Sequence, residues 1–274
     1  MLNNKVCLIV GASGAIGRAI ARRFCEESAR LALTYHTTSH ERISDELRSG
    51  TYEPKSYSVD VTNCRQVAEI IGRVERDFST IDVLVNCSGI VGPIGRLEEN
   101  DPDEWNQTLQ INLSGAFNLA RAVVPVFRRR GGGKIIFFSG GGAAYGRPFF
   151  TAYSSSKAAL VRFTESLAQE VEGDGIQVNA IAPGPVESRM WEQMRAAGSA
   201  GGPKLVAEIE DMDKTGGASA ERAAALAVFL ASHRSDRVTG RLISALWDDW
   251  EHIEPNAARL VGSEAWTLRR TPLQ

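Results

Sequence analysis

Short runs of apolar residues alternate along the chain with longer stretches in which apolar residues recur at helical spacing. Three of the runs are almost wholly apolar, as parallel strands covered by helices on both faces are. The pattern predicts strands at Val6–Val10, Leu31–Tyr35, Ile81–Asn86, Ile135–Phe138 and Gln177–Ala182. It predicts helices at Ala15–Glu27, Ser39–Arg48, Cys64–Phe78, Pro102–Arg129 and Thr151–Glu172. This alternation favours an α/β fold with a doubly wound parallel sheet and right-handed crossovers.

The helix predicted at Pro102–Arg129 has clear end signals. Asp101 can cap its first turn, and proline is well suited to that turn. Three arginines, 128–130, stand at its end and are followed by three glycines, which is typical of a helix terminus. A helix end therefore explains this basic triplet more simply than nucleic-acid binding does.

The domain organisation follows from where the alternation stops. We expect one domain over residues 1–250, because single α/β domains commonly reach this length. Residues 190–218 interrupt the rhythm with a polar helical stretch between glycines, which suggests a mobile lid over a substrate. Residues 251–274 form a polar C-terminal extension that the pattern does not interpret.

Charge and composition exclude several classes of function. The formal net charge is −2, so neither nucleic acid nor an anionic membrane is an expected partner. We expect a cytoplasmic protein, because we find neither a signal peptide nor an apolar run long enough to span a membrane. The four cysteines are dispersed and predict buried thiols rather than a metal site.

The first motif is a glycine loop directly after the first predicted strand. Gly11, Gly14 and Gly17 permit a tight turn and let backbone N–H groups approach a pyrophosphate at the positive end of the next helix. Its position at the first strand–helix junction of an α/β chain indicates a dinucleotide site.

The end of the second strand bears on which dinucleotide binds. An acidic residue there would bind both ribose hydroxyls of NAD and repel the 2′-phosphate of NADP. The segment after Tyr35 is instead His36, Thr37, Thr38 and Ser39. Its lack of an acid favours NADP(H) over NAD(H), although it also contains no arginine or lysine.

Candidate chemistry lies at the start of the helix predicted at Thr151–Glu172. Tyr153 and Lys157 are four residues apart and so share one helix face. A free tyrosine has a pKa of about 10, and a neighbouring ammonium group stabilises its phenolate. We therefore expect Lys157 to lower the pKa of Tyr153 so that it can act as an acid–base catalyst.

The order and spacing of several motifs resemble the short-chain dehydrogenase/reductase family over residues 4–246. The resemblance implies a single Rossmann-type domain with a seven-stranded sheet, and a homodimer or homotetramer. The motifs that carry it are Gly11–Gly17, Asp60-Val61, Asn86-Cys87-Ser88-Gly89, Asn112, Ser139, Tyr153 with Lys157, and Pro183-Gly184.

The resemblance also implies a role for each matching residue. Tyr153 would be the general acid in ketone reduction and the base in alcohol oxidation, and Lys157 would hold the nicotinamide ribose. Asn112 would anchor a water that links Lys157 to solvent. Asp60 would accept a hydrogen bond from the adenine amino group, and Asn86 would stabilise the central strand. The remaining expected cofactor contacts are Gly11, Ser13, Gly14, Ile16, Gly17, Tyr35, His36, Val61, Ser88, Gly89, Pro183, Gly184, Val186 and Ser188.

Three departures from the family pattern stand out. The glycine loop has Val10 and Ala15 where threonine and glycine are usual, and Cys87-Ser88 replaces an asparagine–alanine pair. More seriously, Gly140 stands where the family usually has its catalytic serine. Ser139, one residue earlier, would normally point to the opposite side of the strand, although a glycine-rich loop could turn it into the site. Ser139 is therefore a hypothesis for the donor to the substrate carbonyl.

The substrate pocket is expected from residues 140–150, the segment after Ile90, and residues 190–218. Arg147 suggests an anionic or polar substrate, but an exposed arginine is the simpler interpretation. The leading hypothesis is a reductase or dehydrogenase for a small polar carbonyl, either sugar-like or a secondary metabolite. A 3-oxoacyl-thioester reductase of the fatty-acid type is the alternative. A nicotinamide-binding sensor or scaffold with little catalysis is the third possibility, prompted by Gly140.

Overall fold

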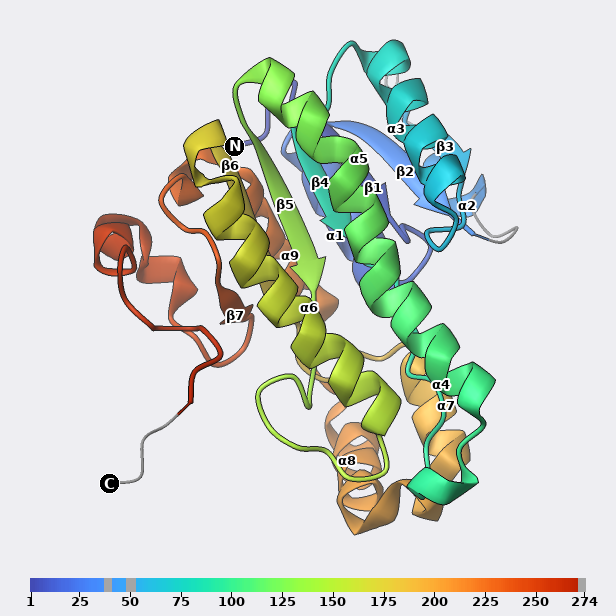
Figure 1. The fold of residues 1–274 in the computed structure, drawn as a ribbon. Coiled ribbons are helices and arrows are strands. Elements are labelled where there is room, and N and C mark those ends of the chain that lie inside the picture. The colour runs from blue at the N-terminus through green and yellow to red at the C-terminus, as the bar shows by residue number, and fades with distance from the viewer. Residues whose placement is uncertain (37–40, 48–52, 271–274) are drawn as a thin grey trace.

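The computed structural model describes residues 1–36, 41–47 and 53–270 and is built on one parallel sheet (Figure 1). Its seven strands have the order β3-β2-β1-β4-β5-β6-β7. This is the doubly wound Rossmann-type arrangement that the sequence predicts. The strands are β1 (Val6–Val10), β2 (Arg30–Tyr35), β3 (Lys55–Ser58), β4 (Val83–Asn86), β5 (Gly133–Phe138), β6 (Ile176–Ala182) and β7 (Leu242–Ser244).

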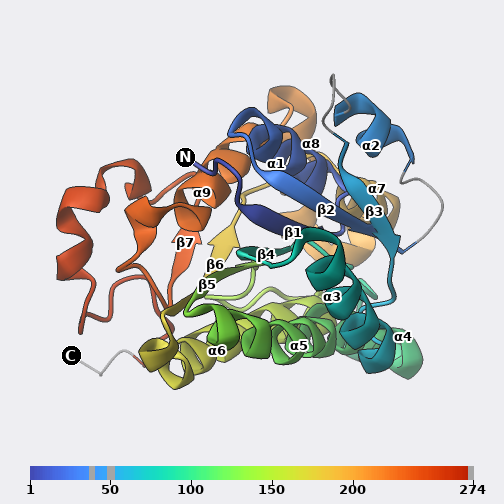
Figure 2. The same cartoon turned by 90° about the horizontal axis from the view of Figure 1, so that it is seen from above.

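Helices cover both faces of the sheet, as Figure 2 shows from above. One layer contains α3 (Cys64–Phe78), α5 (Gly115–Arg130) and α6 (Thr151–Glu170). The other contains α1 (Ala15–Glu26) and α9 (Ala220–Ala231), with α2 (Glu41–Leu47) beside α1. Each layer buries its own apolar cluster against the strands, so the core has two halves separated by the sheet.

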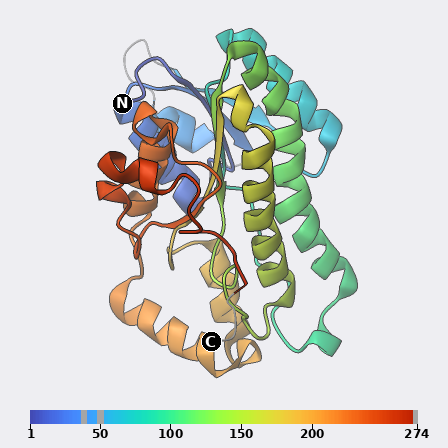
Figure 3. The ribbon, with the colours of Figure 1, turned by 60° about the vertical axis from the view of Figure 1, so that its left-hand side comes forward.

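Three further helices lie beyond the carboxyl ends of the strands: α4 (Pro102–Leu109), α7 (Arg189–Ala197) and α8 (Gly202–Thr215). Helices α7 and α8 share a small apolar cluster with nearby loops, including Val91, Phe150, Trp191 and Leu205. In Figure 3, α7 and α8 form a separate lobe below the sheet. The stretch expected to be a lid is thus two packed helices joined by a short turn.

The observed elements differ from the predicted ones in two ways. Strands β3 and β7 are not among the five that the apolar pattern predicts, since β3 is mostly polar and β7 has three residues. The helix predicted at Pro102–Arg129 is divided, because residues Gln110–Ser114 form one turn of π-helix between α4 and α5. The predicted helix end residues Ser39 and Arg48 lie outside the described residues.

The strand register gathers the predicted motifs at one edge of the sheet. Val10 pairs with Asn86, and Asn86 pairs with Phe137 of β5. Phe137 in turn pairs with Ala180 of β6. The residues that follow these positions therefore lie side by side where the crossovers create a crevice, the usual ligand site of such sheets.

The C-terminal extension packs beside β7 at the edge of the sheet (Figure 3). The Leu242 amide donates to the Trp266 carbonyl at 2.8 Å, so the extension supplies a backbone partner to this edge. The buried Arg241 guanidinium donates to three carbonyls of the extension, those of Leu260, Ser263 and Ala265. Among the described residues, no helix is both long and apolar enough to span a membrane.

Candidate active site

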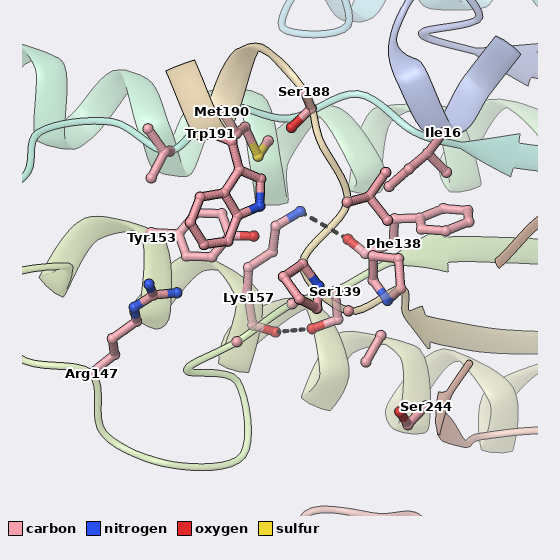
Figure 4. A pocket seen from close by; sticks show the side chains of 18 of the residues that line it. Ile16, Phe138, Ser139, Arg147, Tyr153, Lys157, Ser188, Met190, Trp191 and Ser244 are labelled. Atoms are coloured by element: carbon pink, nitrogen blue, oxygen red, sulfur yellow. Dashed lines mark hydrogen bonds between the residues drawn. The ribbon is translucent and has the colours of Figure 1, made fainter. Parts of the chain in front are cut away.

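A cavity of about 430 Å³ opens where the carboxyl ends of β4, β5 and β6 meet α7 and α8 (Figure 4). Tyr153 and Lys157 enter it from α6, and the glycine-rich loop after β5 forms its floor. Further lining residues come from the phosphate loop, the loop after β4, the β6–α7 segment and the lid helices: Ile16, Ser88, Pro183, Gly184, Val186, Ser188, Met190, Trp191, Met194, Glu208 and Met212.

The glycine loop has the geometry that a pyrophosphate needs. Gly11 has φ +76°, and a Cβ on Gly17 would lie 2.3 Å from the Gly11 carbonyl oxygen, so both positions require glycine. In helix α1, all of whose residues are described, the first turn contains no acidic residue, and no side chain caps it at Gly14. Its positive end is thus left for an anion. Ser13 lies in this loop, and Ile16 reaches the cavity.

Residues at the ends of β2 and β3 lie close together beside this loop. Tyr35 ends β2 and His36 follows it, while Thr37, Thr38 and Ser39 lie outside the described residues. Asp60 Oδ1 accepts from the amide and the hydroxyl of Thr62, at 2.9 and 2.8 Å. Burial opposes ionisation of Asp60, but those hydrogen bonds and nearby His36 together lower its pKa. Val61 packs against Gly115.

Polar residues after β4 organise the centre of the site. The buried Asn86 accepts at Oδ1 from the Ser88 amide at 3.0 Å and from its hydroxyl at 2.6 Å. Gly89 leaves room for two functional groups, since a Cβ there would lie 3.1 Å from Asn112 Oδ1 and 3.3 Å from Lys157 Nζ. Asn86, Ser88 and Gly89 therefore bring the β4 loop against α6.

Asn112 lies in the π turn between α4 and α5 and is buried. Its side chain accepts from the Ile90 amide and donates to the Ile90 carbonyl, both at 2.9 Å. It also donates to Ser156 Oγ at 2.9 Å, and that hydroxyl donates to the Tyr153 carbonyl at 2.7 Å. These bonds join the loop after β4 to the first turn of α6, which carries Tyr153.

Tyr153 and Lys157 share one face of α6 as predicted, with Lys157 Nζ 5.7 Å from the centroid of the Tyr153 ring. The buried Lys157 donates from Nζ to the Phe138 carbonyl at the end of β5, at 2.8 Å. Figure 4 shows this bond and the Tyr153 hydroxyl pointing towards the ammonium group. The ammonium group is thus fixed between the sheet and the tyrosine.

The pKa of Tyr153 differs from the sequence expectation. Burial raises it to about 12, and Arg147, rather than Lys157, is the cation that opposes the rise. Burial also lowers the pKa of Lys157 to about 8. The protein's own groups therefore keep the proton on Tyr153 at neutral pH. The lowering of the Tyr153 pKa that we expected from Lys157 is not seen in the protein alone.

Ser139 is one of the residues that line the cavity, but in this structure its hydroxyl is bonded to α6 and not to Tyr153. Ser139 is buried, and its hydroxyl donates to the Lys157 main-chain carbonyl at 3.4 Å. Gly140 is the residue beside the tyrosine, because a Cβ there would lie 2.4 Å from Tyr153 Oη. The alternation of the strand thus continues to its end, and the position facing the tyrosine carries no side chain.

The segment after β6 forms the wall next to the phosphate loop. Gly184 has φ +84°, and a Cβ there would lie 2.4 Å from Leu246, so glycine is required. Val186 is buried, and Ser188 precedes α7. Together with Pro183 they line the cavity.

Other lining residues lie within two segments that the sequence predicts for the substrate pocket, residues 140–150 and 190–218. Met190, Trp191 and Met194 extend from α7 over the cavity, and their spacing on a helix face is the signal that could have suggested them. Arg147 is not an exposed arginine: its side chain is 11% exposed and pairs with Glu208 of α8. A single arginine in a loop gives no sequence signal of such burial.

Comparisons with known proteins identify the family of the chain. The family model described as enoyl-(acyl carrier protein) reductase matches residues 11–245. The chain is 33% identical to 3-oxoacyl-acyl-carrier-protein reductase FabG of Thermotoga maritima over 253 residues, which is 88% of this chain and 96% of the relative. The NAD⁺-bound structure of xylitol dehydrogenase matches with TM-score 0.81, 29% identity and coverage of 89% and 98% of the two chains. ElxO with NADP bound matches with TM-score 0.76, 27% identity and coverage of 88% and 97%.

The fold, the phosphate loop and the tyrosine–lysine pair define a nicotinamide-dependent oxidoreductase of the Rossmann type. The chain belongs to the short-chain dehydrogenase/reductase family, whose members are NAD(P)-dependent and act on alcohol or carbonyl groups. The solved relatives hold NAD⁺ or NADP, which establishes a nicotinamide nucleotide as the cofactor and leaves the choice between the two forms open.

Proposed function

We propose that the protein interconverts a secondary alcohol and a ketone on a small polar substrate, either sugar-like or a secondary metabolite. Tyr153 acts as the general acid and base. The observation that carries this proposal is the placement of Tyr153 and Lys157 in one cavity with the phosphate loop. Trp191 and Met190 of α7 cover that cavity and exclude water from the reacting group.

The bound cofactor supplies or accepts the hydride, and this chain positions and protonates the substrate. In reduction, Tyr153 Oη donates its proton to the developing alkoxide, and in oxidation it accepts that proton. Lys157 stabilises the resulting phenolate and holds the nicotinamide ribose. Asn112 fixes the first turn of α6 and anchors a water that returns a proton to Lys157. Ser139 has no direct role in this scheme, because its hydroxyl faces α6.

The cofactor contacts follow the residues of the crevice. Backbone N–H groups from Gly11 to Gly17 hold the pyrophosphate, Asp60 and Val61 contact the adenine, and Val186 and Ser188 contact the nicotinamide amide. NADP(H) is the preferred form because β2 ends at Tyr35 and is followed by His36, with no acid at this position to repel a 2′-phosphate.

A 3-oxoacyl-thioester reductase is the second candidate, favoured by the relative from Thermotoga maritima. Such an enzyme needs basic residues that can receive an acidic carrier protein. The arginines at the end of α5 pair with acids of this chain: Arg128 with Asp174, Arg129 with Glu75 and Arg130 with Asp82. Because these arginines are already paired, they would bind an acidic carrier protein more weakly. This favours a small free substrate over one attached to a carrier protein.

At the level of the whole protein, we propose one catalytic domain over residues 1–250, with residues 190–218 acting as a lid. We further propose a cytoplasmic homodimer or homotetramer that binds neither nucleic acid nor membrane. The near-neutral net charge of −2 supports the exclusion of nucleic acid.

The proposal is tested by titrating NADPH and NADH into the protein while following nicotinamide fluorescence, then assaying a panel of polar ketones, alcohols and acyl thioesters. We expect tighter binding of NADPH and turnover of small polar ketones. Turnover of acyl thioesters alone would favour the second candidate. Binding of a nucleotide with no turnover on any substrate would favour a sensor or scaffold.

A further inference from the structure

An ion pair lies at the end of the cavity farthest from the phosphate loop. Arg147, in the segment between β5 and α6, pairs with Glu208 of α8, and both side chains line the cavity. In Figure 4, Tyr153 and Lys157 lie between Arg147 and Ile16, which marks the cofactor loop. A substrate with its carbonyl at Tyr153 therefore extends its other end towards Arg147.

The Arg147 guanidinium group has hydrogen-bond donors to spare. Among the described residues, both of its recorded hydrogen bonds come from Nη2, to Glu208 Oε2 and to Met194 Sδ at 3.9 Å. Nη1 lies beside Gly141, where a Cβ would be 3.3 Å from this nitrogen and 3.4 Å from the Tyr145 hydroxyl, so the position without a side chain borders two hydrogen-bonding groups. The Phe150 ring supports the group, with its centroid 4.1 Å from Cζ.

The surroundings select for one kind of ligand. A guanidinium group presents a planar fork of N–H donors that matches the two oxygens of a carboxylate. Met194 is buried beside it, and Trp191 of the same apolar cluster also lines the cavity. Such an apolar wall strengthens an ionic contact. Besides Glu208, the acids Asp211 and Asp248 also line the cavity, so a ligand with several negative charges would be repelled.

We propose that Arg147 binds a single carboxylate of the substrate, which makes the substrate a short hydroxy acid or keto acid. Glu208 holds the guanidinium group from the α8 side, and the carboxylate takes the edge that carries Nη1. This inference rests on the proposed function and narrows its substrate class. It makes Arg147 a specificity-determining residue, with Tyr153 remaining the acid–base catalyst.

Calorimetric titration tests this without turnover. Keto acids with one, two or three methylenes between ketone and carboxylate are titrated into the protein saturated with oxidised nucleotide, which cannot reduce a ketone. Each acid is compared with its own methyl ester. We expect the best-fitting acid to bind roughly 10- to 100-fold more tightly than its ester, the range for one charge-assisted contact.

The variants locate the effect. Arg147→Gln should bring the ratio of acid to ester affinity close to one and leave ester binding unchanged. Glu208→Gln keeps an acceptor for the guanidinium group but removes a negative charge, so the ratio should rise. Arg195→Gln is the matched control, since Arg195 of α7 pairs with Glu187 and Asp213 outside the cavity lining. The control ratio should equal that of the unaltered protein.

Equal affinity for acid and ester, including no detectable binding of either, would overturn the inference. The inference would also be overturned if Arg147→Gln left the ratio of acid to ester affinity unchanged, or if Glu208→Gln failed to raise it. Glu208→Gln keeps the test valid if Arg147→Gln does not fold. Acid-selective binding through Arg147 without hydride transfer from NADPH or NADH would contradict the proposed function and leave the inference standing. Reduction of ketones with no preference for acids would support the proposed function and overturn the inference about Arg147.

Discussion

Burial shifts the pKa values of Tyr153 and Lys157 in opposite directions. Tyr153 has its pKa raised to about 12, and Lys157 has its pKa lowered to about 8. Each shift disfavours the charged form, because neither group is fully paired within the apolar cavity. At neutral pH the tyrosine therefore keeps its proton, ready for transfer to a carbonyl oxygen.

The lysine shift predicts how stability depends on pH. An unfolded lysine has a pKa of about 10.4, so between about pH 8 and 10 the folded state binds fewer protons than the unfolded state. Lys157 should therefore contribute a rise in the free energy of unfolding with pH across this window, whereas the thiols of Cys7 and Cys87, whose pKa values burial raises, contribute a fall. Lys157→Met should reduce the rise, as measured by urea denaturation at several pH values. Lys134, whose pKa burial also lowers, is present in both proteins and cancels in the comparison. Parallel pH profiles for the two proteins would contradict this assignment.

The absence of a side chain at residue 140 gives a second prediction. A Cβ there would lie 2.4 Å from Tyr153 Oη, so Gly140→Ala should displace the catalytic hydroxyl and lower kcat by about tenfold or more. Gly140→Ser has the same steric effect but adds a donor, so it should recover part of the loss. Steady-state kinetics of the two variants provide the test. Full activity of Gly140→Ala would show that Tyr153 is not held beside residue 140 during the reaction.

Single residues show where sequence reasoning reaches its limit. Tyr153 and Lys157 are predicted by their spacing on a helix, which is a local property. The orientation of Ser139 depends on whether strand alternation continues into a glycine loop, and both outcomes were consistent with the sequence. The burial of Arg147 depends on Glu208 of α8, a contact between distant parts of the chain that no local pattern reveals.

At the scale of elements, the π turn between α4 and α5 is the feature that organises the site. It places Asn112 where its amide bonds both backbone groups of Ile90 and also Ser156 of α6. π turns within α-helices are often found at functional sites. The apolar periodicity of residues 102–129 continues through the turn, so the sequence pattern predicts one unbroken helix there.

Asn112→Ala should therefore destabilise the fold. The change leaves the Ile90 amide and carbonyl without their partner, at about 2–4 kcal/mol in the free energy of unfolding. Asn118→Ala on α5 is the matched control, because Asn118 donates mainly to the Val61 carbonyl, at 2.9 Å. We expect a loss of about 1 kcal/mol for the control, with both measured by chemical denaturation. Equal losses for the two variants would contradict the organising role of Asn112.

Strands β3 and β7 are the two strands that the apolar pattern of the sequence does not predict. The five inner strands are apolar because helices cover them on both faces, so composition identifies them. The edge strands are short and partly polar, and they become strands through their neighbours: β3 through β2, and β7 through β6 and the extension. The pattern of one segment does not contain that information.

At the scale of the whole molecule, the C-terminal extension completes the sheet edge. Its polar sequence predicts no such role, because the contacts are made by backbone carbonyls that accept hydrogen bonds from Arg241. The Trp266 carbonyl accepts from Leu242 of β7, so part of the exposed edge is already covered within the chain. A homo-oligomer would therefore use other surfaces than that part of the edge.

Arg241→Ala should loosen this extension. The change removes a buried donor group that serves three carbonyls, which should lower the free energy of unfolding by about 2–4 kcal/mol and speed proteolysis after Ile253. Arg234→Ala is the control, since Arg234 forms a more exposed pair with Glu254. That change should alter stability by less than about 1 kcal/mol. Similar proteolysis of both variants would show that Arg241 does not hold the extension.

The central claim is that Tyr153 transfers the proton in a nicotinamide-dependent reaction, and Tyr153→Phe tests it most directly. The variant should bind NADPH as the unaltered protein does, because the phosphate loop and Lys157 are unchanged. Its rate of hydride transfer, followed by loss of nicotinamide absorbance with a ketone that the unaltered enzyme reduces, should fall by at least about 10²-fold. Retained cofactor binding with this loss is the predicted result. Near-normal turnover by Tyr153→Phe would contradict the mechanism.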